Sequence, residues 1–169
     1  PDHLAPAAQL VVGDVRDRAA LAEALDGAEA VFHQAAAVGV GQSMYEIERY
    51  VTANSVGTAV LLEEVAARRA RIRRLVVASS MSLYGEGAYR DAAGRLAFPP
   101  PRSAAALAAR AYELCDEAGG PLLPVPTPET KPLQPTSVYA VTKRDHEELC
   151  LTVGEAYGIV GPLGFYRRT

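Results

Sequence analysis

Short apolar runs alternate with longer amphipathic stretches along the first half of the chain. The runs at residues 9–14, 30–35 and 75–80 are almost continuously apolar, which is typical of strands buried in a parallel sheet. Between residues 43 and 71 the apolar positions recur at helical spacing, and Gly57 marks a point of close approach. This alternation predicts an α/β fold, a doubly wound parallel sheet with helices on both faces.

Capping residues indicate where the other helices begin. Asp17 can cap a helix from about Arg18 to Leu25, and Ser137 can cap a helix from about Val138 to Tyr157. Residues 86–134 differ from the rest because they are rich in Pro, Gly and Ala, and only 103–114 look helical there. A segment of this kind is usually an insertion or a functional loop.

Composition limits the classes of function. The chain of 169 residues is 49% apolar and 22% charged, as in globular proteins, and its net charge of −3 would not attract nucleic acid or an anionic membrane. No apolar stretch approaches the ~20 residues that cross a bilayer. Two cysteines are too few for a disulfide framework or a complete zinc site. We therefore expect a cytoplasmic protein without a metal.

Two side chains of the last predicted helix could carry acid–base chemistry. Tyr139 and Lys143 are one helical turn apart and share a face. An ammonium beside a phenol favours the phenolate and so gives a base that works closer to neutral pH. Because this spacing is common by chance, the pair alone does not identify an active site.

A pair of serines follows the third apolar run. The ends of parallel strands meet at one edge of the sheet, where ligands bind in such folds. A hydroxyl of Ser80 at that edge could bind a substrate oxygen and orient proton transfer to Tyr139. The serines could equally satisfy a strand-to-loop turn.

In combination these segments form an ordered set. The chain resembles the extended short-chain dehydrogenase/reductases that act on nucleotide sugars, a family that includes NAD-dependent epimerases and dehydratases. The resemblance covers nearly all of residues 9–158 apart from the insertion. The matching segments are Gly13–Asp17, Val31–Ala36, Asn54–Thr58, Ser79–Gly85 and Pro135–Lys143.

The resemblance implies a partial Rossmann-like domain formed by residues 1–85 and 135–158, interrupted by the insertion 86–134 and followed by a divergent tail, 159–169. It also implies NAD as the cofactor. The implied cofactor-binding residues are Asp14 and Val15 beside the adenine, Ala35 and Ala36 along the dinucleotide, Asn54 supporting the site, and Ser79, Tyr139 and Lys143.

The same resemblance assigns the catalytic roles. Tyr139 would be the acid/base, and Lys143 would favour its phenolate and bind the nicotinamide ribose hydroxyls. Ser80 would bind the sugar hydroxyl or ketone, with Ser79 as its backup. Dehydratases of the family carry Asp-Glu after the catalytic hydroxyl residue, but this chain has Met81-Ser82. The resemblance therefore favours epimerisation at C4 of a UDP- or dTDP-linked hexose through a 4-keto sugar.

Two other functions stay open: an NADP-dependent reductase of a 4-keto nucleotide sugar, and a non-catalytic remnant that serves as an interaction module. The family opens with a glycine-rich turn that holds the pyrophosphate and continues into a substrate-binding lobe, and neither is recognisable in this chain. The resemblance thus predicts an incomplete domain with weak or absent NAD binding and no turnover.

Two further expectations concern assembly and the insertion. The family often forms homodimers through a four-helix contact, for which the helices at 43–71 and 138–157 are the candidates. Within the insertion, Tyr89–Gly94 and Leu114–Gly120 resemble the two knuckles of a zinc ribbon that has lost three of its four cysteines. Since a structural zinc needs about four ligands, we expect this chain to bind none.

Overall fold

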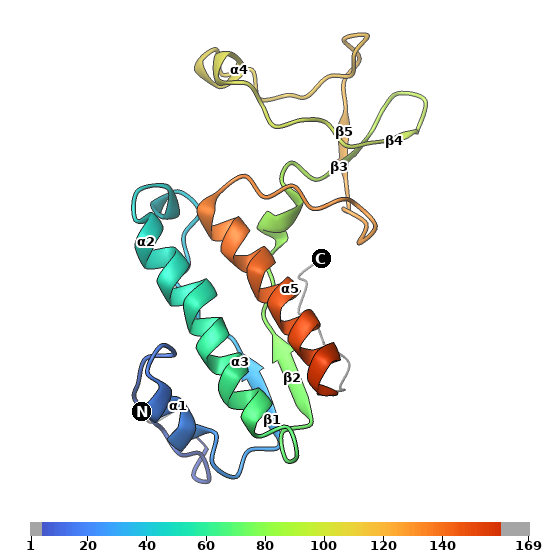
Figure 1. The fold of residues 1–169 in the computed structure, drawn as a ribbon. Helices are drawn as coiled ribbons and strands as arrows, with labels where there is room; N and C mark the ends of the chain where they lie inside the picture. The colour runs from blue at the N-terminus through green and yellow to red at the C-terminus, as the bar shows by residue number, and fades with distance from the viewer. Residues whose placement is uncertain (1–4, 160–169) are drawn as a thin grey trace. The chain divides into compact units, whose positions relative to one another are not determined.

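The computed structural model describes residues 5–159 and divides them into two compact units (Figure 1). Unit 1 contains residues 5–79 and 137–159, and unit 2 contains residues 80–136. The expected divergent tail, apart from Ile159, lies outside the described residues.

A pair of parallel strands forms the sheet of unit 1. β1 (Ala30–His33) pairs with β2 (Arg74–Val77), and Phe32 lies opposite Val76 in this register. Strands that run in the same direction must be joined by a crossover, and a long helical segment supplies it here. The predicted parallel pairing of these two apolar runs is confirmed.

The crossover contains three kinds of helix. A short 3-10 helix, η1 (Gln42–Met44), precedes α2 (Ile47–Tyr50), which runs directly into the π-helix η2 (Val51–Val56) and then α3 (Gly57–Ala67). The predicted helix at 43–71 is thus confirmed over most of its length, and the π-helical turn in its middle was not predicted. Such turns are rare and occur often at functional sites.

The capping predictions are confirmed at both ends of unit 1. Asp17 accepts hydrogen bonds from Ala19 N (2.9 Å) and Ala20 N (3.2 Å) at the start of α1 (Arg18–Ala24). The Ser137 hydroxyl accepts one from Ala140 N (3.1 Å) at the start of α5 (Val138–Tyr157).

α3 and α5 lie side by side against the two strands, and the core forms between them (Figure 1). α1 packs on α3, where Arg18 Nη1 lies 2.7 Å from Glu64 Oε1. The buried core consists of Leu25, Leu61, Leu62, Val65, Ile72, Leu75, Val77, Cys150 and Ile159.

Two strand predictions need correction. Residues 9–14 form no strand, and the side chain of Val12 is 89% exposed, because no described strand supplies hydrogen-bonding partners for this segment. The next run was expected to be buried on both faces, but Phe32 is 68% exposed because neither α3 nor α5 covers its side of β1.

Unit 2 contains a small antiparallel sheet that the sequence did not predict. Its strands are β3 (Ala88–Arg90), β4 (Leu96–Ala97) and β5 (Leu123–Val125), in the order β4-β3-β5. A 3-10 helix, η3 (Met81–Tyr84), precedes them. The only α-helix among the described residues of this unit, α4 (Ala104–Ala108), is shorter than the predicted 103–114, and Arg110 just beyond it has a positive φ of 55°.

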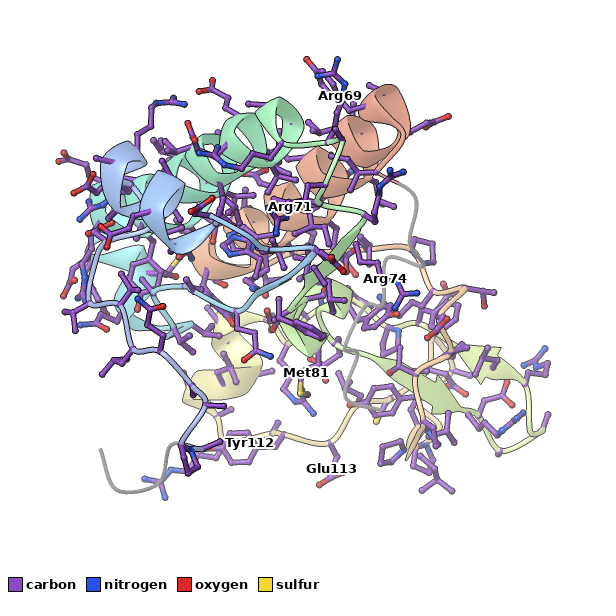
Figure 2. The ribbon with its side chains drawn as sticks, turned by 90° about the horizontal axis from the view of Figure 1, so that it is seen from below. Arg69, Arg71, Arg74, Met81, Tyr112 and Glu113 are labelled. Carbon is purple, nitrogen blue, oxygen red and sulfur yellow. The ribbon has the colours of Figure 1, made fainter. Side chains whose placement is uncertain are left out.

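The basic run after α3 is solvated. The side chains of Arg69, Arg71 and Arg74, labelled in Figure 2, are all exposed. Arg68 donates to the Glu64 carbonyl (3.1 Å) and Arg69 to the Ala66 carbonyl (3.3 Å), as expected for cations at the C-terminal end of a helix.

Candidate functional site

Tyr139 and Lys143 lie one turn apart near the start of α5, and both are buried, with 9% and 2% of their surfaces exposed. Ser43 fixes the start of this helix from outside, because its hydroxyl accepts a hydrogen bond from Tyr139 N (3.0 Å) and donates one to the Val40 carbonyl (2.7 Å). The ring of Tyr139 also packs edge-on against that of Tyr50, with 6.4 Å between centroids.

Asn54 connects the π-helix to two other segments of unit 1. It is fully buried; its Oδ1 accepts from Ala37 N (2.7 Å), and its Nδ2 donates to the Ala37 carbonyl (3.1 Å) and to Thr142 Oγ1 (2.9 Å). Thr142 Oγ1 in turn donates to the Tyr139 carbonyl (2.9 Å). Asn54 therefore holds the loop after β1 against the same turn of α5 that carries Tyr139 and Lys143.

Two stacked histidines lie near Lys143, and one of them contacts it. Its Nζ lies 3.2 Å from Nδ1 of His146, whose ring stacks on that of His33 with 5.0 Å between centroids. His33 Nε2 in turn lies 2.7 Å from Thr58 Oγ1. This cluster lies at the end of β1, between α3 and α5, and all four side chains are buried.

Burial determines the protonation of this cluster. It lowers the pKa of Lys143 to about 8, although the Cys150 sulfur and the Glu147 carboxylate oppose the change. Burial, together with the charge of Lys143, lowers the pKa of His33 to about 4. Burial, Lys143 and His33 lower the pKa of His146 to about 3. At neutral pH the cluster therefore holds one ammonium and two neutral imidazoles.

The two serines at the end of the third apolar run belong to different units. Ser79 is in unit 1, where its hydroxyl donates to Glu147 Oε1 of α5. Ser80 begins unit 2, where its Oγ accepts from Ser82 N (3.2 Å) and lies 2.8 Å from Ser82 Oγ, so that it caps η3. Ser80 is half-buried.

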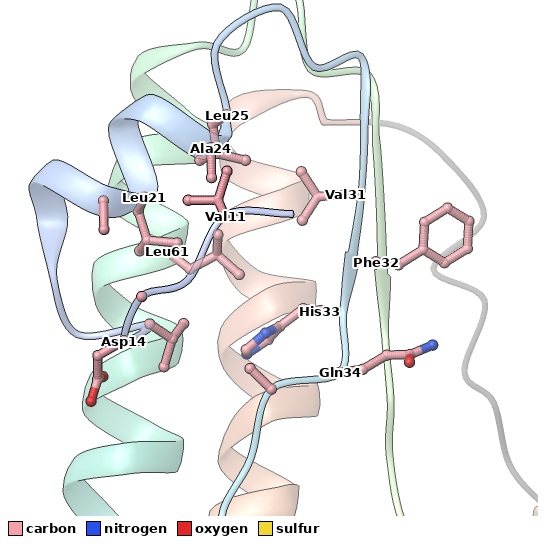
Figure 3. Close-up of a pocket in the computed structure, with 14 residues that line it drawn as sticks. Val11, Asp14, Leu21, Ala24, Leu25, Val31, Phe32, His33, Gln34 and Leu61 are labelled. Carbon is pink, nitrogen blue, oxygen red and sulfur yellow. The ribbon is translucent and has the colours of Figure 1, made fainter. Parts of the chain in front are cut away.

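Unit 1 also contains a cavity of about 240 Å³ between α1, β1 and the segment before α1 (Figure 3). Three of the predicted cofactor-binding residues line it, namely Asp14, Val15 and Ala35, whereas Ala36 does not. Apolar side chains form most of the remaining wall, including Val11, Ala20, Leu21, Ala24, Leu25, Val31 and Leu61.

Asp14 and His33 are the titratable residues that line this cavity. Asp14 Oδ1 accepts from Arg16 N (2.8 Å) and Nε (2.9 Å), and these hydrogen bonds lower the pKa of the Asp14 carboxyl to about 2. In Figure 3, His33 points inward from β1 and Phe32 points to the opposite side of the strand. Because His33 lines the cavity and also stacks on His146, the cavity adjoins the Lys143 cluster.

Sequence reasoning missed part of this arrangement. His33 lies within a matched segment but received no role, and Ser43 and Thr142 carry no pattern that distinguishes them from ordinary polar residues. His146 follows Lys143 by three residues, so helical spacing alone places it beside the lysine and could have identified it.

Residues 5–159 include no group of three or more His, Cys, Asp or Glu side chains that could hold a metal ion. Within the same residues, no helix has the length and apolar character needed to span a membrane.

Residues 1–118 match the model of a family described as the NAD dependent epimerase/dehydratase family. Over 151 residues, 88% of this chain, the sequence is 36% identical to dTDP-L-rhamnose 4-epimerase of Burkholderia thailandensis. It is 39% identical over 80 residues to UDP-glucose 4-epimerase of Yersinia pestis. The chain covers 40% of the first protein and 23% of the second, so it spans well under half of each relative.

Solved structures show the same fold. UDP-glucose 4-epimerase of Thermus thermophilus, solved in complex with NAD, aligns with 93% of this chain and 40% of its own, with a TM-score of 0.63 and 22% identity. That of Brucella ovis, also solved with NAD, aligns with 86% of this chain and 34% of its own, with a TM-score of 0.58 and 24% identity. The partial Rossmann-like α/β fold predicted from the sequence is therefore confirmed.

Proposed function

Because the chain belongs to the NAD dependent epimerase/dehydratase family, we propose that it forms part of an enzyme that epimerises C4 of a nucleotide-linked hexose. The observation that carries this proposal is the buried pair of Tyr139 and Lys143 on one face of α5, which Asn54 ties to the loop after β1. The arrangement suits a phenol that exchanges a proton in a water-poor site, on a helix face that also carries a lysine ammonium.

The cavity fits the adenosine end of NAD. Its walls are mostly apolar, as a purine ring requires, and the Asp14 carboxylate that lines it is ionised and can accept hydrogen bonds from a ligand. Val15 and Ala35 would line the dinucleotide, and Lys143 has ammonium hydrogens left to bind ribose hydroxyls. The chemistry that NAD supplies when bound is reversible hydride transfer at C4 of the sugar.

The residues of this chain would handle the proton. Tyr139 would accept the proton of the sugar 4-hydroxyl as the 4-keto sugar forms. It would return the proton after the 4-keto sugar has rotated to present its other face. The ammonium of Lys143 would stabilise the negative charge on Tyr139 before it accepts this proton and again after it has returned it. Ser80 would hydrogen-bond the 4-oxygen of the sugar.

Epimerisation fits this chain better than dehydration. An elimination needs an acid and a base beside the catalytic hydroxyl, but the residues after Ser80 are Met81 and Ser82, which cannot supply them at neutral pH. The similarity to dTDP-L-rhamnose 4-epimerase, which extends over most of this chain, points to a dTDP- or UDP-linked sugar.

A chimera provides the test. Residues 5–159 would replace the aligned portion of the Burkholderia thailandensis dTDP-L-rhamnose 4-epimerase. The rest of the chimera would keep the Burkholderia sequence. We expect the chimera to interconvert 4-epimers of dTDP- or UDP-hexoses, as measured by NMR of the sugar anomeric protons. The variant Tyr139→Phe should lose at least about 100-fold in kcat, because it lacks the proton-transfer group.

Calorimetry of NAD binding to the chimera and to its Tyr139→Phe variant is the control for folding. If both bind NAD equally and neither epimerises any of these sugars, the proposed reaction is wrong. Full activity in the Tyr139→Phe variant would contradict the assigned catalytic residue.

We also propose that the protein forms a homodimer through helices of unit 1. Apolar side chains on these helices face solvent, among them Ile47, Val51 and Val141, with 53%, 38% and 46% of their surfaces exposed. A second copy related by two-fold symmetry would bury them in a four-helix contact. Sedimentation equilibrium should give twice the mass of one chain for the wild type and the mass of one chain for Val141→Glu.

Unit 2 contains two turns of the same construction, which supports a zinc-ribbon origin of the insertion. Asp91 Oδ1 accepts from Ala93 N (2.9 Å) and Arg95 N (2.9 Å), and Asp116 Oδ1 accepts from Ala118 N (3.0 Å) and Gly120 N (2.7 Å). Each turn also has a left-handed glycine three residues after the aspartate. We propose that the aspartates now hold the two knuckles in shape without a metal.

A further inference from the structure

His146 contacts the Lys143 ammonium directly. It lies on the same face of α5, its exposed surface is 0%, and its Nδ1 is 3.2 Å from Lys143 Nζ. The stacked ring of His33 restricts its orientation from the side of β1. Such a buried side chain cannot turn away from the lysine without opening the core.

The chemistry of the two groups sets the direction of this hydrogen bond. An ammonium has hydrogens to donate and nothing with which to accept, so Nδ1 of His146 must be the acceptor. The proton of the neutral ring then lies on Nε2. Among residues 5–159, this Nε2 is the only buried side-chain nitrogen or oxygen that forms no hydrogen bond of normal geometry.

The Asn54 backbone carbonyl faces the His146 ring and favours its protonated form. The imidazole therefore lies between Lys143 on its Nδ1 side and the segment that carries Asn54. The other titratable groups near Lys143 are His33 from β1 and Glu147 and Cys150 from α5. Burial raises the pKa of the Cys150 thiol to about 12, so it stays uncharged at neutral pH.

A neutral acceptor has a different effect from a carboxylate. A carboxylate at the Nδ1 position would hold the ammonium in an ion pair and offset its charge, whereas a neutral imidazole orients the ammonium without adding to the opposing charge of Glu147. In the proposed function, the charge of the ammonium acts on Tyr139 one turn away.

We propose that His146 is a positioning residue, which accepts a hydrogen bond from Lys143 through Nδ1 and thereby fixes and stabilises the lysine ammonium in the interior of unit 1. Only the effect of this ammonium on Tyr139 rests on the proposed function. The hydrogen bond itself is a property of unit 1 and can be measured without cofactor or sugar.

Nuclear magnetic resonance can test the hydrogen bond directly, because the chain has only two lysines, Lys131 and Lys143, and three histidines. In the wild type, the ring nitrogens of His146 at pH 7 should show a protonated Nε2 and an unprotonated Nδ1. A protonated Nδ1, or a ring protonated on both nitrogens, overturns the proposal. This measurement does not depend on the folding of any variant.

Two substitutions then separate the acceptor from the volume of the side chain. His146→Leu removes the acceptor, and the titration midpoint of Lys143, followed through its ε-carbon signal, should fall by about 1 pH unit or more. His146→Asn keeps an oxygen near the Nδ1 position and should restore most of the wild-type midpoint. Lys131 supplies the reference signal in the same spectra.

An unchanged midpoint in His146→Leu overturns the proposal. An equal fall in both variants overturns it as well, because packing and not the acceptor would then set the charge of Lys143. Neither outcome bears on the epimerase assay, and a failed epimerase assay leaves both measurements valid.

Discussion

At the scale of single residues, the buried neutral histidines make the fold sensitive to acid. In the folded chain the pKa of His33 is about 4 and that of His146 about 3, whereas an unfolded histidine titrates near ~6.5. As pH falls, the unfolded state therefore takes up these protons first. The contribution to stability is complete above pH ~6.5 and is lost as pH falls from there toward about 4 for His33 and about 3 for His146.

We expect the free energy of unfolding to drop by roughly 3 kcal/mol between pH 7 and pH 5, which urea titrations at each pH would measure. Hydrogen bonds from Arg18 and Arg68 hold the pKa of the Glu64 carboxyl below its ordinary value of 4.5, so this carboxyl stays ionised between pH 7 and pH 5. The double variant His33→Gln/His146→Asn should show a much smaller drop. A drop as steep as that of the wild type would mean that other groups cause it.

Sequence reasoning located Tyr139 and Lys143 because their spacing on a helix has a direct geometric meaning, and α5 presents them as expected. It gave no role to His33 or His146, because a histidine in an apolar run is compatible with many functions. The structure distinguishes these two through their stacked rings and the contact with Lys143.

At the scale of elements, the contact between Gly57 and Val15 fixes how the start of α3 meets the segment before α1. A Cβ built on Gly57 would lie 2.5 Å from Val15 Cγ1, which confirms the predicted close approach. Gly57→Ala should therefore destabilise the chain by about 1–3 kcal/mol through overpacking, despite the higher helix propensity of alanine. Thermal or urea unfolding measures this loss.

Gly41→Ala is the matched control, because nothing lies within 4 Å of its added Cβ and its φ of −65° suits any residue. We expect it to leave the stability unchanged or raise it by up to about 1 kcal/mol. The double variant Gly57→Ala/Val15→Ala should recover part of the loss. A Gly57→Ala variant as stable as the Gly41→Ala variant would contradict the packing argument.

Elements with a local signal were predictable and elements that depend on distant partners were not. Asp17 and Ser137 cap their helices within a few residues, so α1 and α5 follow from the sequence. The run at 9–14 has the composition of a strand but lacks a described neighbour with which to pair. β5 has the sequence Leu-Pro-Val, and its proline argues against a strand at this position. The strand forms through its pairing with β3, which the local sequence does not indicate.

At the scale of the whole molecule, the proposed origin of unit 2 predicts that its metal site can be rebuilt. In a zinc ribbon, two Cys-x-x-Cys pairs precede glycines, and the corresponding positions here are Arg90, Ala93, Cys115 and Ala118, ahead of the left-handed glycines 94 and 119. The triple variant Arg90→Cys/Ala93→Cys/Ala118→Cys should bind one zinc per chain. Cobalt absorption in the tetrathiolate range would detect the site.

The same variant with Cys115→Ser added is the control, and it should bind the metal much more weakly because one of four ligands is missing. The wild-type chain should show no tetrathiolate spectrum. If the triple variant also shows none while keeping its secondary structure by circular dichroism, the two turns do not derive from paired knuckles.

The division of unit 1 between two stretches of sequence has a consequence for how the protein is made. Its core contains Leu61 of α3 and Leu75 of β2, but also Cys150 of α5, which follows all of unit 2 along the chain. During translation, the core residues that are made first stay exposed to solvent until α5 has emerged from the ribosome. Unit 2, whose residues are continuous, can fold in that interval. Chaperone binding to arrested nascent chains should therefore persist until residue 150 has left the exit tunnel.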